Sequence, residues 1–129
     1  MRLIEVTATN TENLEDFIAL QLNKFQGWKS EKFYVNKCSR FCIFGGDKMI
    51  ICGKKTFINF DNVFKIMKVK NYDGNDTALR FWTSGGEIEA FLNFESAGKR
   101  DQALGAILDC YYRDEPFCNL EKFEVGEDV

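Results

Sequence analysis

Alternating apolar and polar positions along the chain predict a series of short strands. Between residues 28 and 94, β-rich runs are broken at nearly regular intervals by Gly, Asn, Asp and Ser, which favour hairpin turns. The same alternation predicts a strand at 2–7, with Ile4 and Val6 on its drier face. The strands expected after it are 32–36, 40–44, 49–52, 56–60, 63–69, 78–83 and 87–94. The pattern thus predicts about seven to eight strands in a mainly antiparallel sheet or a small barrel.

A three-to-four-residue period predicts one helix near each end of the chain. In the N-terminal helix, Thr9-Asn-Thr-Glu12 reads as a capping box, apolar positions share one face as far as Phe25, and Gly27 ends the helix. Ser96 is expected to cap the C-terminal helix. The apolar stripe of that helix comprises Ala103, Leu104, Ile107, Leu108 and Tyr111. In the segment 114–125, apolar side chains including Phe117 are expected to hold the chain down as a short strand or turn.

Seven strands followed by a C-terminal helix form an order that resembles the pleckstrin-homology-like (PH-like) barrel. The resemblance covers residues 32–113 and leaves the first strand and first helix as additions. The second helix lacks the Trp usual in that family, and Lys37-Cys-Ser-Arg40 does not have the phosphoinositide-binding spacing. The resemblance therefore implies a fold and no lipid-binding function. The competing architecture is a half-open sheet with both helices on one face, so the predicted class is α+β, in one domain spanning 1–129.

Composition limits the functional classes. The chain has 129 residues, of which 45% are hydrophobic and 29% charged, so a disordered chain is excluded. No apolar run approaches the roughly 20 residues of a membrane helix. The absence of His removes Ser-His and Cys-His nucleophile pairs, and no phosphate loop or dinucleotide fingerprint is present. The carboxylate pairs Asp73/Asp76 and Glu87/Glu89 are solubilising more often than catalytic. We therefore expect no enzymatic activity, no cofactor and no membrane association.

Five widely spaced cysteines indicate a reducing compartment. The count is odd, and no signal-peptide core is found at the N-terminus, so we expect a cytoplasmic protein without disulfides. Four of the thiols could in principle surround zinc, but their spacing is poor and Cys42 lies in a Phe/Ile-rich run, where a thiol behaves as a hydrophobic side chain. These four are Cys38, Cys42, Cys110 and Cys118. We expect no metal site.

Charge is unevenly distributed along the sequence. The net charge of −3 conceals a sum of +8 over residues 24–70 and of −8 over residues 71–129. Segregated charge can orient a protein on a charged partner or on a second copy of itself. The leading hypothesis is a non-enzymatic interaction module, such as an adaptor, inhibitor or assembly subunit. Lys54 and Lys55 near a turn, and Glu87 and Glu89 on a wet strand face, are its candidate binding residues.

The basic segment 24–70 also supports an alternative, the binding of single-stranded nucleic acid. Lysines alternate there with aromatic residues, and such surfaces hold phosphates on cations and stack bases on rings. The candidate residues are Trp28, Lys32, Tyr34, Lys37, Arg40, Lys54 and Lys55. Ten Lys against one Arg in this segment, and a pI near 5.1, favour a plainer interpretation. In it, the aromatic residues, Phe57 among them, form the core and the lysines are solvated.

Overall fold

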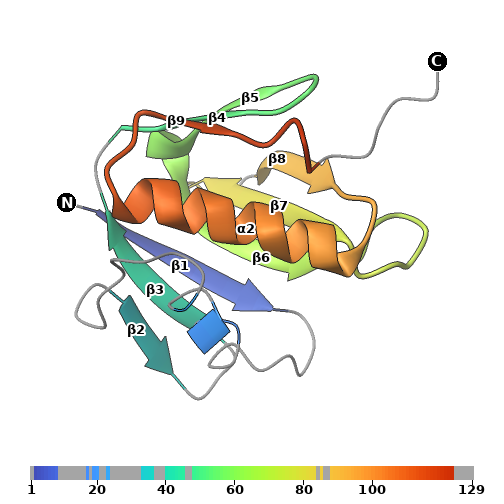
Figure 1. Ribbon diagram of the computed structural model, residues 1–129, viewed down its shortest axis with the longest axis horizontal. Helices are drawn as coiled ribbons and strands as arrows, with labels where there is room; N and C mark the ends of the chain where they lie inside the picture. Colours follow the sequence, from blue (N-terminus) through green and yellow to red (C-terminus); the bar gives the residue numbers. More distant parts are fainter. Residues whose placement is uncertain are drawn as a thin grey trace.

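The computed structural model describes residues 2–8, 17, 19, 20, 23, 33–36, 40–45, 48–83, 85 and 88–123. Within these residues, nine strands form two sheets and a long helix packs against them (Figure 1). The chain therefore has the α+β class that its apolar pattern predicts.

The larger sheet has six strands in the order β2-β3-β1-β6-β7-β8. The alternation predicted for the first strand is observed, because Ile4 and Val6 are fully buried. β1 pairs in parallel with β6, and the other neighbours are antiparallel, so the sheet is mixed. Its strands are β1 (Arg2–Ala8), β2 (Phe33–Asn36), β3 (Arg40–Gly45), β6 (Val63–Val69), β7 (Ala78–Thr83) and β8 (Ile88–Asn93).

The smaller sheet has three strands in the order β5-β4-β9 and lies at the upper edge of the molecule in Figure 1. β4 pairs antiparallel with β5 and parallel with β9, which is the short strand predicted within 114–125. A 3-10 turn, η2 (Phe60–Asn62), leads from β5 into β6 and buries Phe60. The strands are β4 (Ile50–Cys52), β5 (Phe57–Asn59) and β9 (Phe117–Asn119).

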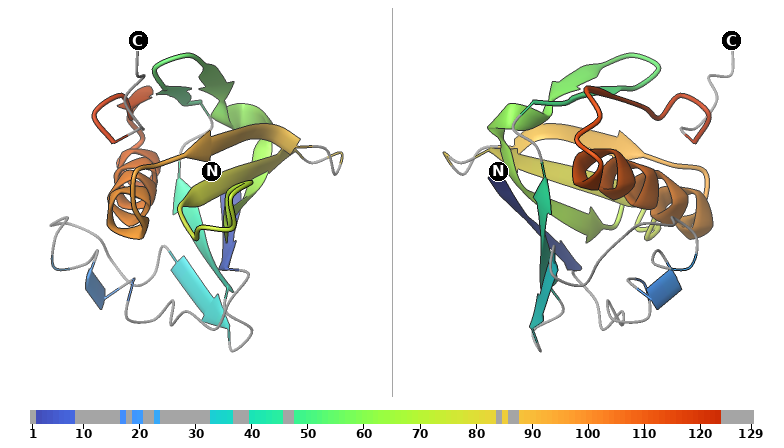
Figure 2. Two further views of the ribbon diagram at one scale, coloured as in Figure 1. Left: turned by 90° about the vertical axis from the view of Figure 1, so that its right-hand side faces the viewer. Right: turned by 60° about the vertical axis from the view of Figure 1, so that its left-hand side comes forward.

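Helix α2 (Ala97–Tyr112) begins at the predicted cap, where the Ser96 side chain accepts a hydrogen bond of 3.1 Å from the Lys99 amide. The whole predicted apolar stripe is buried, so the prediction of this helix is confirmed. Figure 2 shows α2 along one face of the larger sheet. No helix among the described residues covers the opposite face, which agrees in this respect with the half-open architecture.

Gly45 allows close packing between β3 and the end of α2. It is the last residue of β3, and a Cβ atom there would lie 2.3 Å from the Tyr111 carbonyl oxygen. The missing side chain therefore lets the end of α2 approach β3. The Tyr111 ring in turn meets the Phe60 ring edge-on, with centroids 5.3 Å apart.

The resemblance to a PH-like barrel is wrong in its architecture. β1 lies inside the large sheet between β3 and β6, and β2 and β8 remain as open edges, so the sheet does not close. The three-residue strands β4 and β5 leave this sheet and join β9 instead. Of the N-terminal helix predicted up to Gly27, only Phe17, Ala19, Leu20 and Asn23 are described, each with helical backbone. That helix stays a prediction.

Candidate functional site

The smaller sheet has an inward face that is buried in the core and an outward face that is partly exposed. Ile51, Ile58 and Cys118 are opposite one another in the register and are all buried in the core. The residues on either side of them point outward because successive strand side chains alternate between faces. They form two rows, Phe57–Cys52–Asn119 and Asn59–Ile50–Phe117, which we call the small-sheet face.

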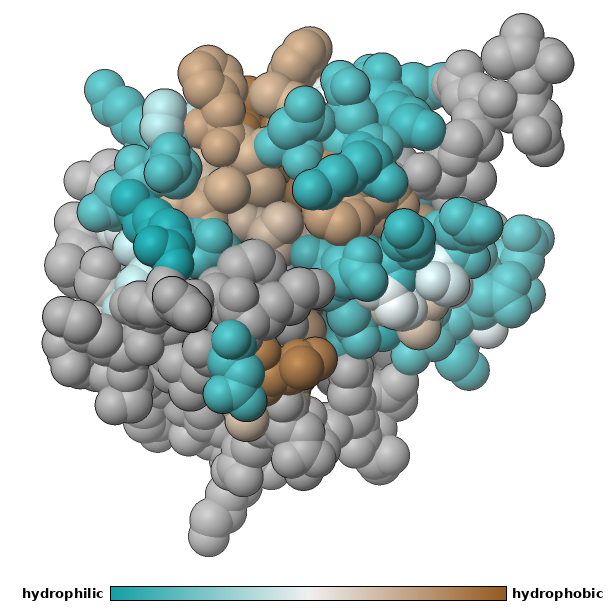
Figure 3. All heavy atoms as spheres, in the orientation of Figure 1, coloured by the Kyte–Doolittle hydropathy of each residue, from teal (hydrophilic) through white to brown (hydrophobic). Residues whose placement is uncertain are grey.

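The small-sheet face exposes aromatic side chains. Phe57 is 75% exposed and Phe117 is 64% exposed, whereas Ile50 and Cys52 between them are half-buried. Figure 3 shows hydrophobic surface at the upper edge, where Figure 1 places β4, β5 and β9. Burying a Phe side chain is worth roughly 1.5–3 kcal/mol, and in this fold most of that remains unrealised for both rings. A clustered, exposed apolar surface of this kind marks interaction sites in folded proteins.

The two ends of the small-sheet face carry opposite charge. Lys54 and Lys55 are exposed in the turn between β4 and β5, which the Gly53 amide closes by donating to the Thr56 carbonyl over 2.8 Å. At the other end, Asp114 and Glu115 are exposed just before β9. The apolar rows are therefore flanked by a basic turn on one side and an acidic turn on the other.

The structure brings together only part of the predicted binding set. Lys54 and Lys55 lie side by side in the exposed turn described above. Tyr34 is in β2, opposite Cys42 of β3, and Arg40 is in β3, opposite Thr7, both in the larger sheet. Glu89 belongs to β8, next to a register shift. The residues Trp28, Lys32, Lys37 and Glu87 lie outside the described residues.

Sequence reasoning missed both exposed rings. It assigned Phe57 to the core and Phe117 to anchoring the C-terminal segment, and the exposure of both rings overturns these assignments. In each strand the middle residue, Ile58 or Cys118, takes the inward position. A signal was present, because both strands read Phe-apolar-Asn, and an Asn two residues along marks the wet face.

The opposed charge blocks of the sequence meet within the fold. Strand β4, from the basic block, pairs with β9 from the acidic one, and β6 likewise pairs with β7. In the core, Lys68 of β6 and Arg100 of α2 are each 1% exposed. Asp101 accepts from both, at 3.0 Å from Lys68 Nζ and 3.1 Å from Arg100 Nε. The blocks therefore partly neutralise each other.

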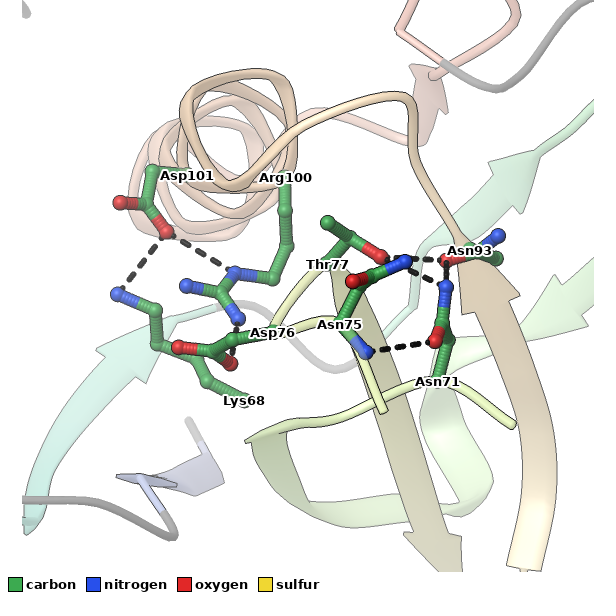
Figure 4. A network of polar contacts seen from close by, with 8 residues as sticks. All are labelled: Lys68, Asn71, Asn75, Asp76, Thr77, Asn93, Arg100 and Asp101. Atoms are coloured by element: carbon green, nitrogen blue, oxygen red, sulfur yellow. Dashed lines mark hydrogen bonds and ion pairs between the residues drawn. The ribbon is translucent and has the colours of Figure 1, made fainter. Parts of the chain in front are cut away.

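Figure 4 shows that this buried cluster extends to the loop between β6 and β7. Arg100 Nη1 pairs with the carboxylate of Asp76, which belongs to the Asp73/Asp76 pair considered in the sequence. Beside it, the Asn71 carboxamide donates to Thr77 Oγ1 over 3.2 Å and to Asn93 Oδ1 over 3.3 Å. Asp76 therefore compensates a buried cation and holds the loop against α2.

None of the four described cysteines, Cys42, Cys52, Cys110 and Cys118, forms a disulfide bond. A hydrogen bond from the Cys118 thiol lowers the pKa of Cys110, and the same bond, together with burial, raises the pKa of Cys118. Among the described residues, no three Cys, Asp or Glu side chains gather as metal ligands. Cys38, the remaining thiol of the zinc alternative, lies outside them.

Within the described part of the chain, no helix has the length and apolarity needed to cross a membrane. Comparison of the chain with family models, curated proteins and solved structures found no match. Function is therefore argued from the surfaces themselves.

Proposed function

We infer that this chain is a non-enzymatic module that binds another protein through the small-sheet face. The observation that carries this proposal is the outward position of Phe57 and Phe117, which are 75% and 64% exposed on adjoining strand rows. Their inward neighbours are fully packed, so these two rings contribute little to the core. A partner that covers them would supply the burial that the fold leaves unrealised.

The chemistry of the partner follows from the surroundings of the rings. It presents apolar side chains to Phe57 and Phe117, and carboxylates to the basic turn of Lys54 and Lys55. Exposed charges of this kind set the orientation and the rate of encounter more than the affinity. The apolar contact accordingly supplies most of the binding energy, and the lysines supply its salt dependence.

The absence of His supports a binding function over catalysis, because the common Ser and Cys nucleophiles rely on an imidazole base. In the hollow beside the β6–β7 loop, which Asp76 and Glu95 both line, Asp76 already pairs with Arg100. Binding through an exposed apolar surface, in contrast, requires no catalytic base or nucleophile.

Differential capture tests the proposal. The wild-type chain, Phe57→Ser/Phe117→Ser, Lys54→Glu/Lys55→Glu and the control Leu20→Ser are used as baits in extracts of the natural host. Leu20 is a matched control because it is 58% exposed and lies outside the small-sheet face. We expect a protein retained by the wild type and by Leu20→Ser, lost with the double Ser variant, and weakened by charge reversal and by salt.

Circular dichroism of each bait checks that the fold is kept. Capture that is equal for the wild type and for Phe57→Ser/Phe117→Ser would refute the role of the small-sheet face.

A further inference from the structure

The face of the larger sheet that points away from α2 carries a second surface of different chemistry. In β6 and β7, Ile66, Leu79 and Phe81 point inward and are fully buried. The residues between them point the opposite way, toward the side that is free of helices among the described residues (Figure 2). We call five residues of this side the open-face cluster. They are Lys65 of β6, Tyr72 of the loop between β6 and β7, Arg80 and Trp82 of β7, and Phe91 of β8.

Cations and rings alternate within the open-face cluster. The Arg80 guanidinium carbon lies 5.9 Å from the centroid of the Trp82 ring and 5.8 Å from that of Phe91. Lys65 Nζ approaches the same Trp82 ring to 5.9 Å. The Tyr72 ring, 90% exposed, lies against Phe91 with centroids 5.0 Å apart. The five side chains thus form one connected strip.

The cations of this strip lack anionic partners within the described structure. No ion pair joins Lys65 or Arg80 to a described carboxylate, whereas Lys68, Arg100 and Arg113 each have one. Arg80 Nε is buried and finds no hydrogen-bond acceptor among the described residues. Within the described residues, this site therefore retains cationic charge that no carboxylate compensates.

The register extends the strip across the sheet. Lys65 and Trp82 belong to the row Tyr34–Cys42–Glu5–Lys65–Trp82, and Arg80 and Phe91 belong to the row Arg40–Thr7–Met67–Arg80–Phe91. At about 4.8 Å per strand, each row spans roughly 20 Å. Among the residues of these rows whose side chains are described, Glu5 is acidic, and Lys65 and Arg80 are basic.

We propose that this open face binds single-stranded nucleic acid. The phosphates pair with Lys65 and Arg80, and unpaired bases stack on the Tyr72 ring. The Phe91 ring packs against the Tyr72 ring and holds it in place. The strip suits single strands because their bases offer free π-faces and the sheet offers rings and cations in alternation. The alternative function drawn from the sequence thus falls mainly on residues outside the segment 24–70. This site is separate from the small-sheet face.

Fluorescence anisotropy with a labelled 15-nucleotide single-stranded DNA of mixed sequence, at low salt, tests the proposal. Tyr72→Ala removes a stacking ring that is almost wholly exposed, so the fold is retained. It should weaken binding roughly 5- to 150-fold, which is the loss of one stacked base. Phe64→Ala, at 39% exposure on the same sheet and outside the cluster, serves as the matched aromatic control and should bind as the wild type does.

Salt dependence tests the cation contacts. Arg80→Gln should reduce the slope of log K against log salt by about 0.7, the value of one phosphate contact on a single strand. Lys48→Gln, at an exposed lysine outside the cluster, should leave the slope unchanged. In a Trp28→Phe background, Trp82 is the sole Trp, and its emission should change as the DNA binds.

Three results would overturn the proposal. The first is the absence of a complex at 100 µM protein, on the order of the weakest non-specific binding. The second is binding that Tyr72→Ala and Arg80→Gln leave unchanged. The third is equal competition by polyphosphate at matched charge, which would show that bases do not contribute. Because Phe57 and Phe117 take no part in this assay, its failure would leave the proposed protein-binding function standing.

Discussion

The inward and outward sides of the two sheets differ in the burial and the charge pairing of their side chains. On β6, Lys68 points inward and pairs with Asp101, whereas Lys65 points outward and meets the ring of Trp82. On β5, Ile58 is 1% exposed, whereas its neighbour Phe57 is 75% exposed. Residues of one strand thus differ according to the face they occupy: inward side chains are packed and paired, whereas outward side chains are partly exposed to solvent.

This difference separates residues that maintain the fold from those available for binding. Burying an ion is costly unless partners compensate it, and the inward cations have carboxylates that do so. The outward cations and rings are held by weaker cation–π contacts, each worth roughly 0.5–1 kcal/mol at exposed sites. We therefore expect inward substitutions to change stability and outward substitutions to change binding.

A large loss of stability is expected from Asp101→Ala. This change leaves Lys68 and Arg100, both 1% exposed, without the carboxylate that they share, and should cost about 3 kcal/mol of unfolding free energy. Asp109→Ala breaks a pair with the exposed Arg113 and should cost at most about 1 kcal/mol. Urea denaturation measures both. Equal losses would remove the distinction between buried and surface charges.

The next effect is expected at Gly45. An added methyl group in Gly45→Ala would lie 2.3 Å from the Tyr111 carbonyl oxygen, so α2 must shift, at a cost of roughly 1–3 kcal/mol. Gly98→Ala, where the nearest atom is 3.7 Å away in the first turn of α2, should be neutral or stabilising. Thermal unfolding compares the two variants. A Gly45→Ala protein as stable as the wild type would contradict the close approach.

A smaller effect concerns thiol reactivity. Because a hydrogen bond from Cys118 lowers the pKa of Cys110, Cys110 should form its thiolate, and react with iodoacetamide, at a lower pH than an ordinary cysteine. Cys118→Ala removes that bond, so the midpoint of the rate–pH profile of Cys110 should move to higher pH. Peptide mapping after timed labelling measures this. An unchanged or lowered midpoint would contradict the shared hydrogen bond.

Much of the local structure could be predicted from the sequence. The β-rich runs and the turn residues between them located the strands to within about one residue, and Ser96 with the stripe around Leu104 and Ile107 defined α2. These features are local, since they depend on the spacing of neighbouring residues and on capping chemistry. The orientation of Phe57 and Phe117 also had a local signal, in the Asn residues that follow them.

The pairing of distant strands could not be predicted. The parallel contacts of β1 with β6 and of β4 with β9 join segments more than 50 residues apart, and alternation does not specify a partner. The open-face cluster also depends on strand pairing, because Lys65, Arg80 and Phe91 become neighbours only once the consecutive strands β6, β7 and β8 are in register. A basic sequence block was therefore a poor guide to the basic surface.

The most direct test compares the urea unfolding of Phe57→Ser/Phe117→Ser with that of Ile58→Ala. It measures whether the outward rings contribute to the free energy of unfolding. The account predicts that the double variant stays within about 0.5 kcal/mol of the wild type, since both rings are largely exposed. Ile58→Ala, on the inward side of the same sheet, should lose roughly 2–5 kcal/mol. A double variant that loses as much as Ile58→Ala would show that the exposed rings stabilise the fold and would contradict their assignment to binding.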